Sequence, residues 1–244
     1  MRLSEIFPID QWNFNTRSIL NALSEDDYDF LIGKQGEQKY QKGEVIFKEG
    51  MVPSGIYFIH KGKIKKYKIG LAGKEQIIYV ANKNELIGYH AVLSQERYPD
   101  SAATLEESVL TFIPKEDFLS ILHQSPAFAN RLLKALSHEY SVLANSISIF
   151  SQGTAAERLA ISLILIREKS KIETPEGEET MINISRSDLA NMAGLLAVLV
   201  VVMENSIFAM VLFPVSVAGN AGAVALRSSG KPFVSITSIS MMRN

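Results

Sequence analysis

The stretch from residue 126 to 150 repeats apolar side chains at steps of three and four, which is typical of one face of a helix. These positions are Phe128, Leu132, Leu136, Tyr140, Leu143, Ile147 and Phe150. The stretch has no glycine, its only proline stands first, and Ser125 is a suitable N-cap. A helix of about seven turns is hard to bury in one small domain. We therefore predict that it connects two domains or pairs with its own copy, and an ordinary helix covering a sheet is the alternative.

Short strand-like runs punctuated by glycine precede this helix. They are Val45–Phe47, Ile56–Ile59, Ile64–Lys68, Gln76–Val80, Leu86–Ile87, Ala102–Leu105 and Val109–Ile113. Gly62 and Gly73, each followed by lysine, are expected at hairpin turns. The spacing predicts an antiparallel barrel or sandwich, with partly irregular helix over residues 1–34 and a short helix over 115–124.

Helical sequence follows the long helix. Residues 154–169 predict a second helix, the polar residues 170–180 an exposed turn, and residues 181–184 a short strand. Ser185 is then a good N-cap for a short helix that Gly194 would close. A short capped helix ending in glycine is the first half of a helix-turn-helix.

The amino-acid composition excludes several kinds of chemical site. The chain has 244 residues, 47% hydrophobic and 21% charged, with a net charge of −1, so any affinity for nucleic acid must come from a local patch. It has no cysteine, which excludes disulfides, thiolate metal sites and a cysteine nucleophile, and is compatible with a reducing cytosol. The first residues lack an apolar signal core, so no export signal and a cytoplasmic location are expected.

Candidate catalytic and metal-binding residues are few. His90 could ligate haem or a metal, but the remaining histidines, at positions 60, 123 and 138, have no paired spacing with it. We therefore expect His90 to be a pocket-wall or loop residue and expect no metal or cofactor. Neither a supported Ser/His/Asp arrangement nor a GxxxxGK loop is present, so an enzyme is not expected.

In this order the segments resemble the cyclic-AMP receptor/fumarate-nitrate-reductase (Crp/Fnr) superfamily of bacterial transcription regulators. KGEVIFKEGMVPSGIYFIHKGKIKKYK resembles the glycine-punctuated β-roll of that family, and NELIGYHAVL resembles the segment over its ligand pocket. The long helix resembles the family's dimerisation helix, and ISRSDLANMAG resembles the start of its DNA-binding unit. The resemblance covers about residues 35–194.

The resemblance implies an α+β fold in three parts. Residues 1–125 would form an effector-sensing antiparallel β-roll (a double-stranded β-helix of the cyclic-nucleotide-binding kind) with N-terminal helices. Residues 126–150 would form the dimerisation helix, and residues 151–244 a winged helix-turn-helix. The function implied is that of a homodimeric DNA-binding regulator in which an effector shifts the population of DNA-competent states, with half-sites about one DNA turn apart.

The resemblance also implies partners and sites. The partners are double-stranded DNA, a second copy of the chain, RNA polymerase and a small-molecule effector of unknown identity; no membrane is among them. The seam between copies would contain Leu132, Leu136, Tyr140, Leu143 and Ile147. DNA phosphates would be approached by Ser185, Arg186 and Ser187. An effector pocket would lie at Gly88, Tyr89, His90, Asp100 and Ser101.

Three departures from the family pattern concern the effector. Cyclic-nucleotide binders have a glutamate just after the pocket glycine, where this chain has Tyr89 and His90. They have an arginine before a serine–alanine pair, where this chain has Asp100, and an aspartate would repel a phosphate. They also place hydroxyl side chains on the dimerisation helix, where this chain has Leu143 and Ala144. We therefore predict no ordinary binding of cyclic AMP or cyclic GMP: the pocket holds another ligand or is filled by its own side chains.

The sequence changes character after Gly194. Only Glu204, Arg227, Lys231 and Arg243 are charged in the last fifty residues, and residues 195–203 are all apolar, so the expected base-reading side chains are absent. A frameshift or incorrect residue assignment, a degenerate unit converted into a partner interface, a membrane contact and a natural winged domain of unusual composition are four explanations. The alternative function is a sensory or protein-interaction β-roll dimer that does not bind DNA.

Overall fold

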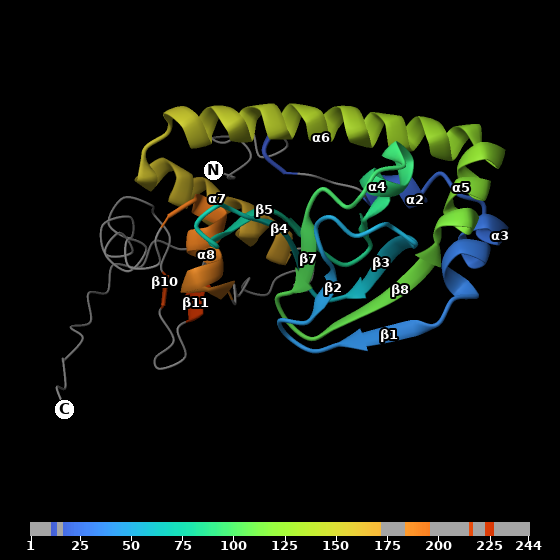
Figure 1. Ribbon diagram of the computed structural model, residues 1–244, viewed down its shortest axis with the longest axis horizontal. Coiled ribbons are helices and arrows are strands. Elements are labelled where there is room, and N and C mark those ends of the chain that lie inside the picture. Colours follow the sequence, from blue (N-terminus) through green and yellow to red (C-terminus); the bar gives the residue numbers. More distant parts are fainter. Residues whose placement is uncertain (1–10, 14–16, 172–183, 196–214, 217–222, 227–244) are drawn as a thin grey trace.

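The computed structural model describes residues 11–13, 17–171, 184–195, 215–216 and 223–226 (Figure 1). Most of the sequence after Gly194, and with it the predicted recognition helix, therefore lies outside the described residues, as do residues 181–183 of the predicted short strand.

Two four-stranded antiparallel sheets form the β-roll (Figure 1). One has the order β1-β8-β3-β6 and the other the order β2-β7-β4-β5. Their bounds are β1 Glu37–Tyr40, β2 Val45–Phe47, β3 Gly55–Lys61, β4 Ile64–Ile69, β5 Glu75–Ala81, β6 Leu86–Ile87, β7 Ser101–Thr104 and β8 Ser108–Pro114. Inward-facing residues such as Phe47, Ile59 and Leu110 pack between the sheets, as alternation along half-buried strands requires.

Tight turns join the long strands. Gly62, between β3 and β4, has a φ of 96°, and Gly73, between β4 and β5, has a φ of 72°. A side chain at either position would be strained, which explains the glycines that the sequence places there. At Gly62 a Cβ atom would also lie only 2.2 Å from the Ser108 Oγ. The predicted hairpin turn at Gly73 is confirmed, because β4 and β5 pair with each other. The prediction for Gly62 is wrong: it stands in a tight turn, but this turn joins two strands that belong to different sheets.

Helices cover one end and one side of the β-roll. They are α2 Arg17–Leu20, α3 Glu25–Tyr28, the π-helical turn η2 Asp29–Gly33, α4 Tyr89–Ser94, α5 Lys115–Gln124 and α6 Pro126–Gln152. Helix α6 spans the whole length of the molecule along one side (Figure 1). Its Phe128 and Leu132 pack with Phe118 of α5, Ile56 and Phe58 of β3, and the N-terminal helices in one apolar cluster.

The C-terminal unit begins after α6. Helix α7 covers Ala155–Lys171 and α8 covers Arg186–Ala193, and strands β9 Ile184–Ser185, β10 Val215–Ser216 and β11 Ala223–Leu226 form a small antiparallel sheet of order β10-β11-β9. The Ser185 Oγ accepts a hydrogen bond from the Asp188 N–H, and Gly194 closes α8 with a φ of 64°. Both predicted helix caps are confirmed.

The strand positions were predicted to within one or two residues, and the α+β architecture is confirmed. Strand β1 was missed because its side chains are mostly exposed and polar, so the edge strand carries no apolar alternation. Helix α4 was missed because it is only six residues long. Helix α6 runs two residues beyond the predicted end, to Gln152.

Candidate functional site

A cavity of about 260 Å³ lies between the β-roll and the long helix. Strands β4 and β5, helix α4, the segment before β7 and helix α6 all contribute to its walls. The lining residues are Lys66, Lys68, Ile78, Tyr79, Leu86, Tyr89, His90, Pro99, Asp100, Glu139 and Leu143. It is therefore a mixed cavity, with an apolar part and several charged groups of both signs.

Lys66 on β4 forms an ion pair in this cavity with Asp100, which stands just before β7. The Lys66 Nζ lies 3.0 Å from the Asp100 Oδ2, and both residues are buried. A buried charge without a partner is costly, so each holds the other in place. The position at which relatives would need an arginine for a phosphate is thus occupied by an acid that already neutralises the nearest cation.

Glu139 connects the cavity to the long helix. It is buried on α6, its carboxylate accepts a hydrogen bond from the Tyr89 hydroxyl, and its Oε2 lies 2.7 Å from the His90 Nε2. Burial alone would raise the pKa of the Glu139 carboxyl, but the His90 and Tyr89 hydrogen bonds and the nearby His90 and Lys66 charges lower it below its usual value. The same burial raises the pKa of the Tyr89 hydroxyl, with the Glu139 charge adding to the effect.

Replacing Glu139 with glutamine is expected to lower the free energy of unfolding at pH 7 by about 1.5–3 kcal/mol, because hydrogen bonds to a charged group are lost. The carboxyl's pKa is depressed in the folded state, so its contribution is fully present above the ordinary value of 4.5 and disappears as pH falls through the lowered value. The difference between the two proteins should therefore be largest near neutrality and shrink below pH 4.5.

Urea unfolding of both proteins at several pH values, at one protein concentration, measures this difference. Glu107→Gln is the matched control, since Glu107 is exposed in the turn between β7 and β8. An equal difference at neutral and acidic pH would contradict the assigned role of the Glu139 carboxylate.

The five residues predicted for the effector pocket do not all reach the cavity. Tyr89, His90 and Asp100 line it. Gly88, with a φ of 87°, instead begins α4, and the Ser101 Oγ accepts a hydrogen bond from the Glu49 N–H. His90 is a wall residue on α4, where it was expected. Sequence reasoning missed Lys66 and Glu139; the one signal available was a glutamate in the middle of an otherwise apolar helical face.

The predicted DNA-binding residues stand at the start of α8. Ser187 is exposed, whereas Ser185 and Arg186 are partly buried. The Ser185 hydroxyl donates a hydrogen bond to the Asp188 Oδ2 at 2.6 Å, in addition to capping the helix. The hydroxyl that was expected to approach a phosphate is thus engaged within its own helix.

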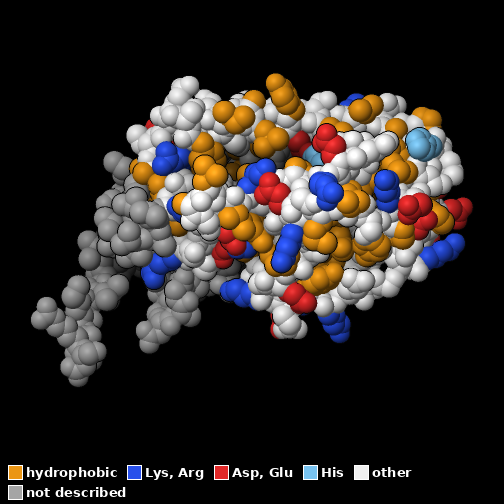
Figure 2. Space-filling view, viewed as in Figure 1, with side chains coloured by type: hydrophobic (Ala, Val, Ile, Leu, Met, Phe, Trp, Pro, Cys, Tyr) orange, Lys and Arg blue, Asp and Glu red, His pale blue; other side chains and the backbone are white. Residues whose placement is uncertain are grey.

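Helix α6 has a second apolar face that its own chain leaves exposed. Leu133, Tyr140, Leu143, Ile147 and Phe150 are between 40% and 75% exposed. In contrast, Leu132, which we predicted to lie in the seam between copies, is only 2% exposed and packs into the core of its own chain. The prediction for Leu132 is therefore wrong, because the apolar residues of this helix divide between two faces. Hydrophobic side chains are visible along the edge of the molecule that α6 forms (Figure 2).

Two kinds of feature are absent from the described residues. In that part of the chain, no group of three or more His, Asp or Glu side chains lies close enough together to hold a metal ion. None of its helices combines the length and the apolar character that crossing a membrane requires.

The amino-acid sequence of this chain is similar to those of known proteins. Residues 37–125 match the family model described as a cyclic nucleotide-binding domain. The anaerobic regulatory protein of Haemophilus influenzae is 28% identical over 176 residues, which cover 72% of this chain and 67% of that protein. The transcriptional activator protein Anr of Pseudomonas aeruginosa is 28% identical over 176 residues, 71% of each chain.

Solved structures share the fold at lower identity. The global regulator CLP of Xanthomonas campestris superimposes with a TM-score of 0.65 at 15% identity, over 84% of this chain and all of that one. FixK2 of Bradyrhizobium japonicum gives the same TM-score at 18% identity, over 80% of this chain and 93% of its own. These two likenesses concern the fold alone.

Proposed function

The chain belongs to the Crp/Fnr superfamily of transcription regulators, and from this premise we propose that it is a homodimer that binds DNA under the control of a small molecule. In this proposal residues 1–125 sense the effector, residues 126–150 dimerise and residues 151–244 contact DNA. The location would be the cytoplasm, where DNA and RNA polymerase are found, and RNA polymerase would be a further partner.

The observation that carries the dimer is the spacing of the exposed face of α6. Leu133, Tyr140 and Ile147 are seven residues apart, and Leu136, Leu143 and Phe150 repeat the same interval three residues later. This is the a and d pattern of a two-stranded coiled coil. Of these six, Leu136 is half-buried, because it also packs against the core of its own chain. A single helix cannot bury such a stripe, and a second copy related by a two-fold axis covers it completely. The seam predicted from sequence is kept at Leu136, Tyr140, Leu143 and Ile147, with Leu133 and Phe150 added.

The DNA-binding segment is proposed at α8 and the sheet that adjoins it. Strand β9 leads into α8 and pairs with β11, an arrangement that fits a winged helix-turn-helix. Arg186 and Ser187 stand in the first turn of α8 and are proposed to contact phosphates, while Ser185 contributes by capping the helix. No base-reading residue is assigned, because these would follow Gly194.

The effector is proposed to be neither cyclic AMP nor cyclic GMP. Lys66, a buried cation of the cavity, is paired with Asp100, so a phosphate would have to displace a buried carboxylate. The charges that line the cavity largely balance, since Lys66 and Lys68 face Asp100 and Glu139. An uncharged or zwitterionic molecule that fits a cavity of about 260 Å³ suits this lining better than a nucleotide.

Selection of bound duplexes from a random-sequence DNA pool tests the function. The expected product is a two-fold symmetric sequence with half-sites about 10 base pairs apart, bound by a particle of twice 27.0 kDa. Arg186→Ala should weaken binding to all sequences about equally, by roughly tenfold or less, because a phosphate contact carries no sequence information. Arg131→Ala, on the exposed side of α6, is the control.

The alternative, a protein-interaction dimer without DNA binding, rests on the apolar sequence after Gly194. Intact mass and peptide mapping of that region separate the two. A genuine apolar tail together with a dimer that enriches no DNA sequence would establish the alternative and refute the regulator proposal for this chain.

A further inference from the structure

The β-roll and the C-terminal unit share one apolar cluster. Tyr67 of β4 and Ile77 and Val80 of β5 pack with α7 and α8, represented by Leu159 and Leu189. All of these side chains are buried. The two units are therefore docked through a continuous apolar contact. Ion pairs and hydrogen bonds between polar groups surround this contact and add to the stability of the docked arrangement.

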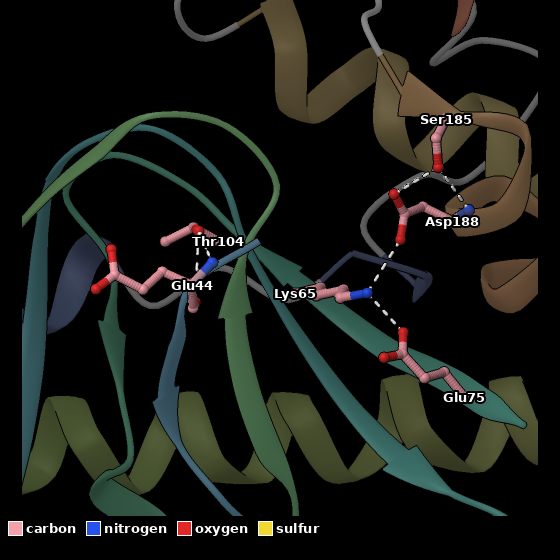
Figure 3. Close-up of polar contacts among 6 residues, drawn as sticks. All are labelled: Glu44, Lys65, Glu75, Thr104, Ser185 and Asp188. Atoms are coloured by element: carbon pink, nitrogen blue, oxygen red, sulfur yellow. Dashed lines mark hydrogen bonds and ion pairs between the residues drawn. The ribbon is translucent and has the colours of Figure 1, made fainter. Parts of the chain in front are cut away.

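Lys65 joins the two units at the amino end of α8 (Figure 3). Its Nζ lies 2.5 Å from the Glu75 Oε2 on the neighbouring strand and 3.1 Å from the Asp188 Oδ1 in the first turn of α8. The other oxygen of Asp188 accepts the hydrogen bond from the Ser185 hydroxyl. The first turn of α8, in which Arg186 and Ser187 stand, is thus held against β4.

Lys169 makes a second connection, from the end of α7. Its Nζ lies 2.7 Å from the Glu85 Oε1 and 2.9 Å from the Tyr79 hydroxyl, and the Tyr79 hydroxyl also donates to Glu85. Glu85 and Lys169 are both almost fully buried. The Asn82 side chain donates to the Lys169 carbonyl, while its own Oδ1 is buried without a hydrogen-bond partner.

Both connections start from strands that also line the effector cavity. Lys65 and Lys66 are consecutive on β4, so their side chains leave the strand on opposite faces, one toward α8 and the other toward Asp100 in the cavity. Lys66 is the cross-strand partner of Tyr79, which lines the same cavity and contacts Lys169 through its hydroxyl. These two residues therefore connect the cavity with the contacts to α7 and α8.

We propose that the Lys65 and Lys169 contacts form an autoinhibitory latch, which holds the C-terminal unit on the β-roll and thereby lowers its affinity for DNA. Occupation of the cavity releases the latch through Lys66 and Tyr79. The inhibitory role rests on the proposed DNA binding, whereas the docking itself does not. The latch is therefore tested by two independent readouts.

Three variants weaken the latch at different residues. Lys65→Gln and Asp188→Asn break the same ion pair from its two sides, so that a folding defect of one leaves the other for the test. Tyr79→Phe keeps the ring in the cavity and removes the hydroxyl that contacts Lys169. Lys63→Gln is the matched control, because the Lys63 Nζ pairs with Glu106 within the β-roll at 3.0 Å.

Docking is measured without DNA, by amide hydrogen exchange of α7 and α8 and by the emission of Trp12. Trp12 is the chain's single tryptophan and lines a small cavity between β5, α6, α7 and α8, which Lys169 also lines. Exchange in these helices should be about fivefold faster or more in the three latch variants, with Trp12 emission at longer wavelength, and unchanged in Lys63→Gln. Unchanged exchange in all three variants would overturn the latch.

Inhibition is measured by the anisotropy of a fluorescein-labelled random-sequence duplex, without effector. Released variants should bind it about fivefold more tightly than the unmodified chain. Faster exchange with equal or weaker duplex binding would overturn the inhibitory role. Failure of every protein, the unmodified chain included, to bind any duplex would refute the proposed function and with it inhibition, while the exchange and Trp12 measurements would still decide the docking.

Discussion

Replacing Lys169 with methionine lowers the free energy of unfolding by about 3–5 kcal/mol, the loss expected when one partner of a buried ion pair is removed. Methionine keeps an unbranched apolar stem but removes the ammonium group, with its charge and its hydrogen bonds to Glu85 and Tyr79. The Glu85 carboxylate, which is 1% exposed, is then left in the interior without the ammonium group that lies 2.7 Å away. The Tyr79 hydroxyl remains as a donor but supplies no charge.

Urea unfolding followed by Trp12 emission measures this loss, since Trp12 and Lys169 line the same cavity. The double variant Glu85→Gln with Lys169→Met removes both charges and should recover most of the lost stability. Lys48→Met, at an exposed position of the β-roll, should change it little. If the double variant proves as unstable as the single one, the loss comes from packing and not from the unpaired carboxylate.

Glutamate at both Tyr140 and Ile147 is expected to abolish association of the two copies, with an increase of at least about 100-fold in the dimer dissociation constant. Each helix would bring two carboxylates into the seam, opposite the same two of its partner. Like charges that face each other without water cost several kcal/mol, and every 1.4 kcal/mol is a factor of ten. Tyr140 and Ile147 are 75% and 69% exposed in the single chain, so its own fold does not need them.

Sedimentation equilibrium over a range of concentrations gives the mass directly. Ser141→Glu adds a charge to the same helix at an exposed position outside the seven-residue repeat and should leave the dimer intact. Circular dichroism should show that the double variant keeps its helices. A folded double variant that still sediments at twice the chain mass would show that α6 is not the interface.

Regular spacing made the helices and strands of this chain predictable, but not the direction in which each apolar residue points. Helix α6 is apolar on two faces, and steps of three and four fit either face. Leu132 was therefore placed in the seam, whereas its neighbour Leu133 is the residue that stands 60% exposed. Only the packing of α6 on α5 and β3 separates the two, and that packing is not local in sequence.

The ion pairs between the β-roll and the C-terminal unit could not be predicted from the sequence for the same reason. Lys65 and Asp188 are 123 positions apart, and Lys169 and Glu85 are 84 apart. A lysine on an alternating strand reads as a solvated side chain until the strand's neighbours are known. In contrast, Ser185 and Gly194 were predicted correctly as caps, because a cap depends on residues within one helical turn.

The seam of α6 is flanked by Ser137, Ala144 and Ser151, each exposed and uncharged. Counterions therefore have little to screen between the two helices, and ionic strength should scarcely affect their association. The proposed DNA contacts are the opposite case, since each phosphate neutralised releases counterions and the affinity falls steeply as salt is added. Titration with potassium chloride should therefore dissociate the duplex while the dimer stays intact. The same titration thus distinguishes dimerisation from DNA binding.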